Sequence, residues 1–283
     1  MVIGDCLVEA VSYLREAGDD TAFLDARALI CHVLDCDMLY LTVHRDELMD
    51  DKAAQLFRDL INRRGTGEPV AQLVRHKEFM SIDFYVDERV LVPRPDTEHL
   101  AEYALEFCQG RKAPRVLDLC TGSGALAVSI AHYAPHSRVF AADISDGALE
   151  ICAKNAKKNS AEVTVFRMDV LTELATHDQT YDLIVSNPPY IEHDVIASLD
   201  KDVAMFEPHL ALDGGEDGLD FYRVLAKECP LLLSDGGSLA FEVGIGQADS
   251  VAEMMRESFC DIEIRKDYAG IERVVYGIKK ASD

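Results

Sequence analysis

The chain has 283 residues, of which 48% are hydrophobic and 28% are charged, a balance that is usual for a soluble globular protein. Its 51 acidic residues outnumber 28 basic ones and give a net charge of −23, which argues against a nucleic-acid partner because phosphate contacts need Lys and Arg. No apolar run reaches the roughly 18 residues of a membrane span, so we expect no membrane partner, and the acidic residues near the start lead us to expect no signal peptide. The eight cysteines form no C-x-x-C pair, so we expect free thiols, no metal site and a cytoplasmic location.

Residues 1–75 are predicted to form a small helical bundle. Apolar residues recur at helical spacing in three stretches, the first beginning near Leu7 and the third ending at Gly65. Basic residues directly before that glycine are typical of a helix end. Composition alone leaves open whether the bundle only packs or also recognises a partner.

Residues 76–92 are predicted to form a β-hairpin linker, because apolar and polar side chains alternate there. Asp87-Glu88 is the expected turn of this hairpin. Two prolines in the segment Pro93–Glu98 exclude regular structure, and a helix that runs to Phe107 is expected to follow.

Residues 93–283 are predicted to form an α/β domain. Strands and helices alternate after Pro114, which favours parallel strands joined by right-handed crossovers. Two β-like runs around Tyr268 predict a terminal antiparallel hairpin on the same sheet. The expected parallel strands are 116–120, 139–142, 163–168, 183–186 and 239–243, with helices at 125–133 and 145–159.

A glycine loop, D-L-C-T-G-S-G from Asp118 to Gly124, ends the first of these strands and opens a helix. Small residues there let a ligand approach the helix N-terminus, and Asp143 at the end of the next strand can bind two ribose hydroxyls. This pattern indicates an adenosine-type ligand and leaves NAD and S-adenosylmethionine open, although a pyrophosphate has no evident basic partner. Asp169 ends the third strand, where it either accepts from an adenine amino group or caps a turn.

The sharpest signal is Asn187-Pro188-Pro189-Tyr190, which directly follows the fourth strand. Prolines donate no backbone hydrogen bonds, and Asn187 adds a side-chain carbonyl acceptor. The tetrad is typical of a receptor for a planar –NH2 group, which donates to Asn187 and to the Pro188 carbonyl and stacks on Tyr190. Such a site holds a weakly nucleophilic nitrogen in line with a methyl donor.

The tetrad and the glycine loop together resemble class I amino-group N-methyltransferases. The segment Val90–Glu98, which reads V-L-V-P-R-P-D-T-E, and the motifs around Glu68, Glu207 and Gly214 narrow the resemblance. They are similar to the peptide chain release factor N5-glutamine methyltransferases, the HemK or PrmC family. The resemblance implies a Rossmann-like, mostly parallel seven-stranded sheet with a C-terminal antiparallel hairpin, preceded by a helical bundle that recognises the partner.

The resemblance also implies the reaction, which is methyl transfer from S-adenosyl-L-methionine to the glutamine amide of the Gly-Gly-Gln motif in release factors, with S-adenosyl-L-homocysteine as product. We expect a monomer. Asn187 to Tyr190 would be catalytic and, with Arg94, would bind the substrate. The implied cofactor-binding residues are Cys120, Thr121, Gly122, Ser123, Gly124, Asp143, Asp169, Val170 and Asn187.

Two positions depart from the family pattern. Cys120 stands where the loop often has glycine, which is tolerable if the backbone there has a negative φ. Val170 stands where some members have an aromatic residue, so it covers the adenine without stacking. Three alternatives stay open, namely a methyltransferase of another protein's glutamine, a DNA adenine N6-methyltransferase, and a binding module without turnover.

Overall fold

A computed structural model describes residues 1–281 of the chain, which divide into two units. The first unit comprises Met1–His76 and a later segment, Leu199–Phe206. The second comprises Lys77–Ser198 and the chain from Glu207 onward. Among the described helices, none is both long and apolar enough to cross a membrane.

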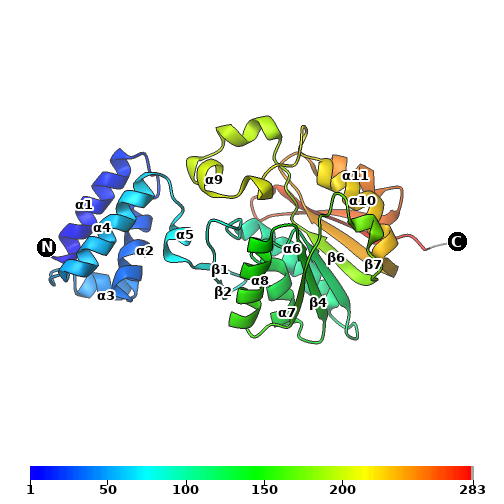
Figure 1. The fold of residues 1–283 in the computed structure, drawn as a ribbon, viewed down its shortest axis with the longest axis horizontal. Coiled ribbons are helices and arrows are strands. Elements are labelled where there is room, and N and C mark those ends of the chain that lie inside the picture. Colours follow the sequence, from blue (N-terminus) through cyan, green and yellow to red (C-terminus); the bar gives the residue numbers. More distant parts are fainter. Residues whose placement is uncertain (282–283) are drawn as a thin grey trace. The chain divides into compact units, whose positions relative to one another are not determined.

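The first unit contains the predicted helical bundle, which is confirmed (Figure 1). Its helices meet along their apolar sides, where Leu14 and Ala26 are fully buried and Phe57 is 2% exposed. Asp50 begins the fourth helix, because its carboxylate accepts from the backbone N–H of Lys52 at 2.8 Å. The helices are α1 (Ile3–Glu16), α2 (Ala22–Leu34), α3 (Met38–Val43), α4 (Asp51–Gly65) and α5 (Val70–Val74).

A segment far along the sequence completes this unit. It contains the short helix α9 (Lys201–Phe206). The buried Gln72 side chain donates from Nε2 to the carbonyl oxygen of Phe206 at 3.1 Å. A Cβ on Gly67 would lie 3.2 Å from the Cβ of Lys201, so the two backbones approach closely. The predicted boundaries at residues 75 and 92 give no sign of this segment, because only its tertiary contacts assign it to the first unit.

The linker hairpin exists, but its predicted turn is wrong. β1 (Lys77–Phe79) pairs with β2 (Ile82–Phe84), so the turn is Met80-Ser81 rather than Asp87-Glu88. Both turn residues have positive φ, 50° and 58°, which is the geometry of a tight two-residue hairpin. The backbone N–H of Met80 donates to Oε1 of Glu98 at 2.7 Å. This contact with the following helix stabilises a turn that lacks glycine or asparagine.

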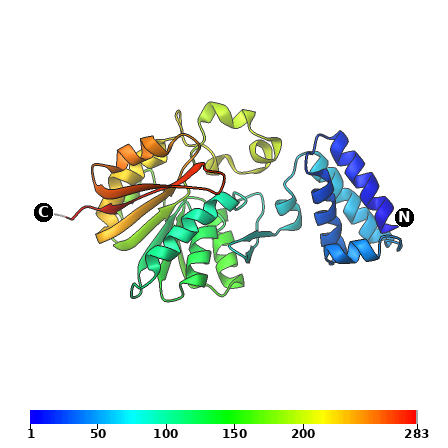
Figure 2. The ribbon, with the colours of Figure 1, turned by 180° about the vertical axis from the view of Figure 1, so that it is seen from behind.

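The second unit contains the predicted mostly parallel seven-stranded sheet, which is confirmed (Figures 1 and 2). The strand order is β5-β4-β3-β6-β7-β9-β8, and within the described residues β9 alone runs opposite to the other six strands. The order reverses at β3, between β4 and β6, and ligands bind at the carboxyl ends of strands at such a point. The strands are β3 (Arg115–Leu119), β4 (Arg138–Asp143), β5 (Val163–Arg167), β6 (Tyr181–Ser186), β7 (Leu233–Glu242), β8 (Phe259–Lys266) and β9 (Glu272–Lys279).

Helices cover the sheet of the second unit in two groups. One group packs α7 between α6 and α8, and the other packs α10 against α11. Both groups bury apolar stripes, and α7 is buried along nearly its whole length. The helices are α6 (Glu98–Cys108), α7 (Ala125–Tyr133), α8 (Asp146–Lys158), α10 (Asp220–Leu232) and α11 (Ala248–Met255).

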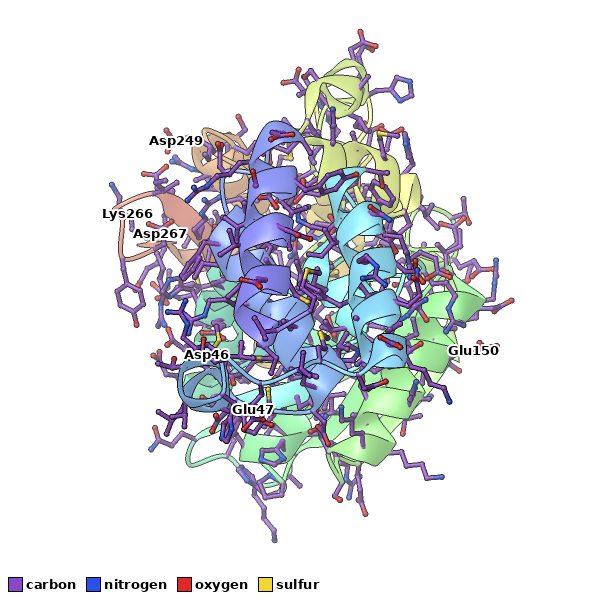
Figure 3. The ribbon with its side chains drawn as sticks, turned by 90° about the vertical axis from the view of Figure 1, so that its left-hand side faces the viewer. Asp46, Glu47, Glu150, Asp249, Lys266 and Asp267 are labelled. Carbon is purple, nitrogen blue, oxygen red and sulfur yellow. The ribbon has the colours of Figure 1, made fainter. Side chains whose placement is uncertain are left out.

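Acidic side chains project from the surface of both units, as the excess of Asp and Glu requires (Figure 3). Asp46 and Glu47 follow α3 in the first unit, with 92% and 57% of their side chains exposed. Glu150 on α8 is similarly exposed in the second unit. A surface of this sign offers little to a phosphate backbone.

Candidate active site

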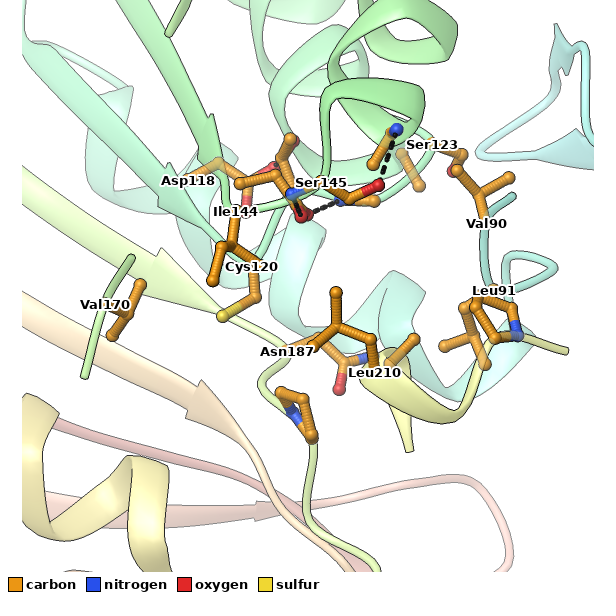
Figure 4. A pocket seen from close by; sticks show the side chains of 18 of the residues that line it. Val90, Leu91, Asp118, Cys120, Ser123, Ile144, Ser145, Val170, Asn187 and Leu210 are labelled. Atoms are coloured by element: carbon orange, nitrogen blue, oxygen red, sulfur yellow. Dashed lines mark hydrogen bonds between the residues drawn. The ribbon is translucent and has the colours of Figure 1, made fainter. Parts of the chain in front are cut away.

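A cavity of about 220 Å³ lies at the carboxyl edge of the parallel strands (Figure 4). The loops that follow β3, β4 and β6 contribute to its wall, so the elements predicted to bind a ligand do converge. Figure 4 shows Val90 and Leu91 on the side opposite Val170, with Leu210 between them beside Asn187. These apolar side chains enclose a site whose polar groups come from the strand ends.

The glycine loop is held by Asp118, which is 1% exposed at the end of β3. Its Oδ2 accepts from Oγ1 of Thr121 at 2.6 Å and from the backbone N–H of Ala127 at 3.1 Å. Its Oδ1 has no hydrogen-bond partner within residues 1–281, although Asp118 borders the cavity. Burial raises the pKa of Asp118 to about 7.

The two glycines of the loop have different reasons to be glycine. A Cβ on Gly124, whose φ is +81°, would lie 2.7 Å from Sγ of Cys152 on α8. A Cβ on Gly122, whose φ is +53°, would meet no atom within 4 Å. Gly124 therefore permits close packing of the loop against a helix, whereas Gly122 leaves open space beside the cavity.

Cys120 has a φ of +59°, so the condition given above for tolerating a cysteine there, a negative φ, is not met. The left-handed conformation favours glycine, because a Cβ there approaches the neighbouring carbonyl oxygen. The thiol packs against the core of the second unit and also borders the cavity. Its contacts therefore hold a cysteine in a conformation that it adopts at some cost.

Asp143 ends β4 and joins two loops. Its Oδ2 accepts from the backbone N–H of Gly122 and its Oδ1 from that of Ser145, each at 2.9 Å. Burial is the main influence on this carboxyl and raises its pKa. The carboxylate borders the cavity, where its remaining lone pairs are suited to ribose hydroxyls.

Asp169 and Val170 also border the cavity, after β5. Asp169 caps a local turn, since Oδ1 accepts from the N–H of Leu171 at 3.0 Å and Oδ2 from Oγ1 of Thr172 at 2.9 Å. The capping role considered above is therefore present, and contact with adenine stays a prediction. Val170 is 4% exposed and offers an apolar face.

Asn187 follows β6, and the hydrogen bonds of its side-chain amide indicate which group it could bind. Its Nδ2 donates to Oγ1 of Thr97 at 3.2 Å, whereas its Oδ1 accepts no hydrogen bond from residues 1–281. Asn187 and Pro189 border the cavity; in the described chain Pro188 and Tyr190 do not. The Tyr190 hydroxyl instead points to Oε1 of Glu242 at 3.5 Å, and burial raises its pKa.

Comparisons with known proteins agree on one family. A family model described as the PrmC N-terminal domain matches residues 5–74, and one described as the methyltransferase small domain matches residues 100–207. The release factor glutamine methyltransferase of Clostridium acetobutylicum is 38% identical over 99% of both chains. The protein of that name from Geobacter sulfurreducens is 41% identical over 94% of this chain and 92% of its own.

The chain belongs to the release factor glutamine methyltransferase family. A solved methyltransferase from Pyrococcus furiosus has the same fold, with a TM-score of 0.53 and 18% identity over 78% of this chain and 99% of its own. The predicted family and fold are thereby confirmed.

Membership of a methyltransferase family implies S-adenosyl-L-methionine as methyl donor. The cavity fits such a group on three observations: the unpartnered buried oxygen of Asp118, the open space at Gly122, and the carboxylate of Asp143. Within residues 1–281, no group of three or more His, Cys, Asp or Glu side chains is arranged to hold a metal ion.

The segment Pro93–Glu98 borders this family site, and its polar side chains are fixed by different elements. Arg94 pairs with the buried carboxylate of Glu207 at 2.6 Å, and Asp96 pairs with Arg273 of β9 at 2.8 Å. Arg94, predicted to bind substrate, therefore has an intramolecular partner at the edge of the cavity. The pair ties this segment to the chain that follows α9.

The tetrad backbone is supported from outside the cavity. Nε2 of Gln247 donates to the carbonyl oxygen of Tyr190 at 2.9 Å. A Cβ on Gly214 would lie 2.9 Å from the carbonyl oxygen of Pro189, so this loop packs directly on the tetrad. The N–H of Ile191 donates to the carbonyl of Leu212 at 3.0 Å, which closes the base of the intervening loop.

The sequence patterns missed Glu242, which ends β7 beside the tetrad. It is 2% exposed, and burial raises its pKa to about 7. One signal was present, because Glu242 is acidic at the carboxyl end of a strand, as are Asp143 and Asp169. Because it stands near the end of an otherwise apolar run, it was indistinguishable in sequence from a polar residue that marks the end of a strand.

Proposed function

We propose that this chain transfers a methyl group from S-adenosyl-L-methionine to the side-chain amide nitrogen, N5, of the glutamine in the Gly-Gly-Gln motif of peptide chain release factors. The full-length similarity to enzymes named for that activity supports the proposal. The observation that carries it here is the free Oδ1 of Asn187 at the cavity wall, with Nδ2 already committed to Thr97.

The residues of the tetrad would bind and orient the glutamine amide. Oδ1 of Asn187 would accept one N–H of the substrate. The carbonyl of Pro188 is the predicted acceptor of the other and accepts no hydrogen bond within residues 1–281, although Pro188 does not border the cavity. Amide nitrogen is a weak nucleophile, so positioning matters, and ideal positioning contributes on the order of 7 to 11 kcal/mol. No strong base is needed beforehand, because the nitrogen becomes acidic as it is methylated and then loses its proton to solvent.

The cofactor, when bound, supplies an electrophilic methyl group and leaves as S-adenosyl-L-homocysteine. Asp143 would bind the ribose hydroxyls, and Asp169 and Val170 would border the adenine. The loop residues would line the methionine part, and these are Cys120, Thr121, Gly122, Ser123 and Gly124. No metal is needed for this transfer.

The partner is a release factor, and the protein would act in the cytoplasm as a monomer. The helical bundle, which matches the PrmC N-terminal domain over residues 5–74, would recognise this partner. The acidic surface favours a protein partner over nucleic acid.

Mass spectrometry of purified release factor tests the proposal after incubation with the protein and S-adenosyl-L-methionine. We expect a gain of one methyl group, mapped to the Gly-Gly-Gln glutamine, and no gain with an Asn187→Ala variant. Duplex DNA carrying adenine is incubated in parallel. No methylation of the release factor, with cofactor binding shown separately, would contradict the proposal and move the substrate to another protein or to DNA.

A further inference from the structure

A buried carboxyl group lies behind the tetrad, on the side away from the cavity. Glu242 ends β7, and its backbone carbonyl accepts from the hydroxyl of Tyr222 at 2.8 Å, which fixes the main chain there. Oε1 accepts from the Tyr190 hydroxyl at 3.5 Å, and Oε2 has no hydrogen-bond partner within residues 1–281. A side chain this polar is costly to bury unless it interacts with its neighbours.

The neighbours of Glu242 come from several elements. The Thr97 and Asn187 side chains stabilise its ionised form, and so does Arg273 of β9. Asp96 opposes ionisation, although Arg273 pairs with it at 2.8 Å. Thr97 itself is 4% exposed, at the end of a short 3-10 helix, Pro95–Thr97. The Asn187 amide thus has oxygen acceptors on its buried side.

This arrangement decides which end of the Asn187 amide faces the cavity. A threonine hydroxyl has one proton and two lone pairs, so it can accept from Nδ2 of Asn187 and donate to the Glu242 carboxylate. If the amide rotated by half a turn, Oδ1 would face the Thr97 oxygen, whose proton is directed at ionised Glu242. The correct orientation matters because only Oδ1 can accept from a substrate –NH2 group, whereas Nδ2 would repel it.

We propose that Glu242 and Thr97 are positioning residues that hold the Asn187 amide with its oxygen toward the substrate nitrogen. The proposal rests on the proposed function, since the orientation is useful only if Asn187 receives an amino or amide group. In its ionised form Glu242 can only accept hydrogen bonds, so the Thr97 hydroxyl beside it would donate to the carboxylate and accept from Nδ2 of Asn187.

Kinetics with purified release factor test the positioning role at saturating S-adenosyl-L-methionine. Thr97→Val keeps the shape of the side chain without the hydroxyl, and Glu242→Met removes the acceptor at similar length. We expect each to lower kcat by about tenfold or more, as for other lost preorganised hydrogen bonds, while the Kd for S-adenosyl-L-homocysteine changes less than about twofold. Thr97→Ser should keep kcat within about threefold of wild type, because it retains the hydroxyl.

A double variant and a matched control separate positioning from simple loss of packing. Both residues act through Asn187, so Thr97→Val with Glu242→Met should lower kcat no more than the stronger single change. Ser238→Ala serves as control, because Ser238 is a fully buried hydroxyl on the same strand that bonds Tyr103. It should lower stability without lowering kcat. An unchanged kcat in Thr97→Val, or equal losses in Thr97→Ser and Thr97→Val, would overturn the proposal.

A second measurement needs no turnover and therefore remains informative if the release factor is not the substrate. The Asn187 side-chain amide signal in ¹⁵N–¹H spectra is the one lost in Asn187→Ala. We expect its protons to exchange more slowly in wild type and Ser238→Ala than in Thr97→Val or Glu242→Met. Equal exchange rates in all four proteins would overturn the positioning role, whereas an inactive wild type with this protection intact would count against the proposed function alone.

Discussion

The guanidinium of Arg94 lies 2.6 Å from the carboxylate of Glu207, which also accepts from the backbone N–H of Val92 at 3.1 Å. Only 1% of the Glu207 side chain is exposed, compared with 38% of Arg94. Arg94→Ala would leave a buried charge without this partner, so we expect unfolding free energy to fall by about 1–3 kcal/mol. Urea denaturation measures the loss. Arg256→Ala, which breaks an exposed pair with Glu253, should change stability by less than about 1 kcal/mol. Equal effects of the two changes would refute the structural role of the buried pair.

Asn187→Ala should lower kcat well over tenfold, about 1.4 kcal/mol or more, because the acceptor for the substrate amide is removed. The Kd for S-adenosyl-L-methionine, measured by calorimetry, should stay within about twofold of wild type, since the glycine loop and Asp143 are untouched. Turnover at the wild-type rate would rule out the tetrad as the amide receptor.

Asp143→Ala should weaken cofactor binding about tenfold or more, because it removes both the ribose acceptor and the anchor of the Gly122 and Ser145 backbones. Titration with S-adenosyl-L-homocysteine measures the affinity. Asp146→Ala is the matched control, because that carboxylate lies three residues later and is 83% exposed. An affinity equal to that of the control would exclude the ribose role.

Cys120→Val should destabilise the protein by roughly 2 kcal/mol, because a β-branched residue fits poorly at a φ of +59°. Cys120→Gly should stay within about 1 kcal/mol of wild type. Glycine relieves the strain of the left-handed backbone, but it also raises the entropy of the unfolded chain and removes the sulfur contacts. Thermal unfolding of both variants checks the order. Cys120→Val as stable as wild type would show that the left-handed backbone is not strained.

Asp118 makes the stability of the protein depend on pH. Its pKa is about 7 in the folded state, well above the usual value of an unfolded aspartate, so the folded protein holds a proton that the unfolded chain releases. This stabilising contribution is present at pH 4 and is lost as pH rises toward 8; Glu242 acts in the same direction. We therefore expect the unfolding free energy, measured by denaturation without cofactor, to fall less between pH 5 and pH 8 in Asp118→Asn than in wild type. An identical loss in both proteins would contradict the raised pKa.

The sheet and the glycine loop could be predicted because short apolar runs and small residues carry their local signals directly. The turn at Met80-Ser81 could not, since neither residue favours positive φ and the stabilising contact comes from Glu98. Glu242 was missed for a related reason. Its proposed role depends on Thr97 and Asn187, which lie far from it in sequence and meet it only through the fold.

The chain between Ile191 and Leu212 leaves the tetrad and returns to it through a backbone hydrogen bond at its base. This hydrogen bond fixes the two ends of the loop independently of the conformation of the residues between them. Changes in this loop outside Leu199–Phe206, the segment that packs into the first unit and is bound by Gln72, can therefore alter its exposed surface without displacing Asn187.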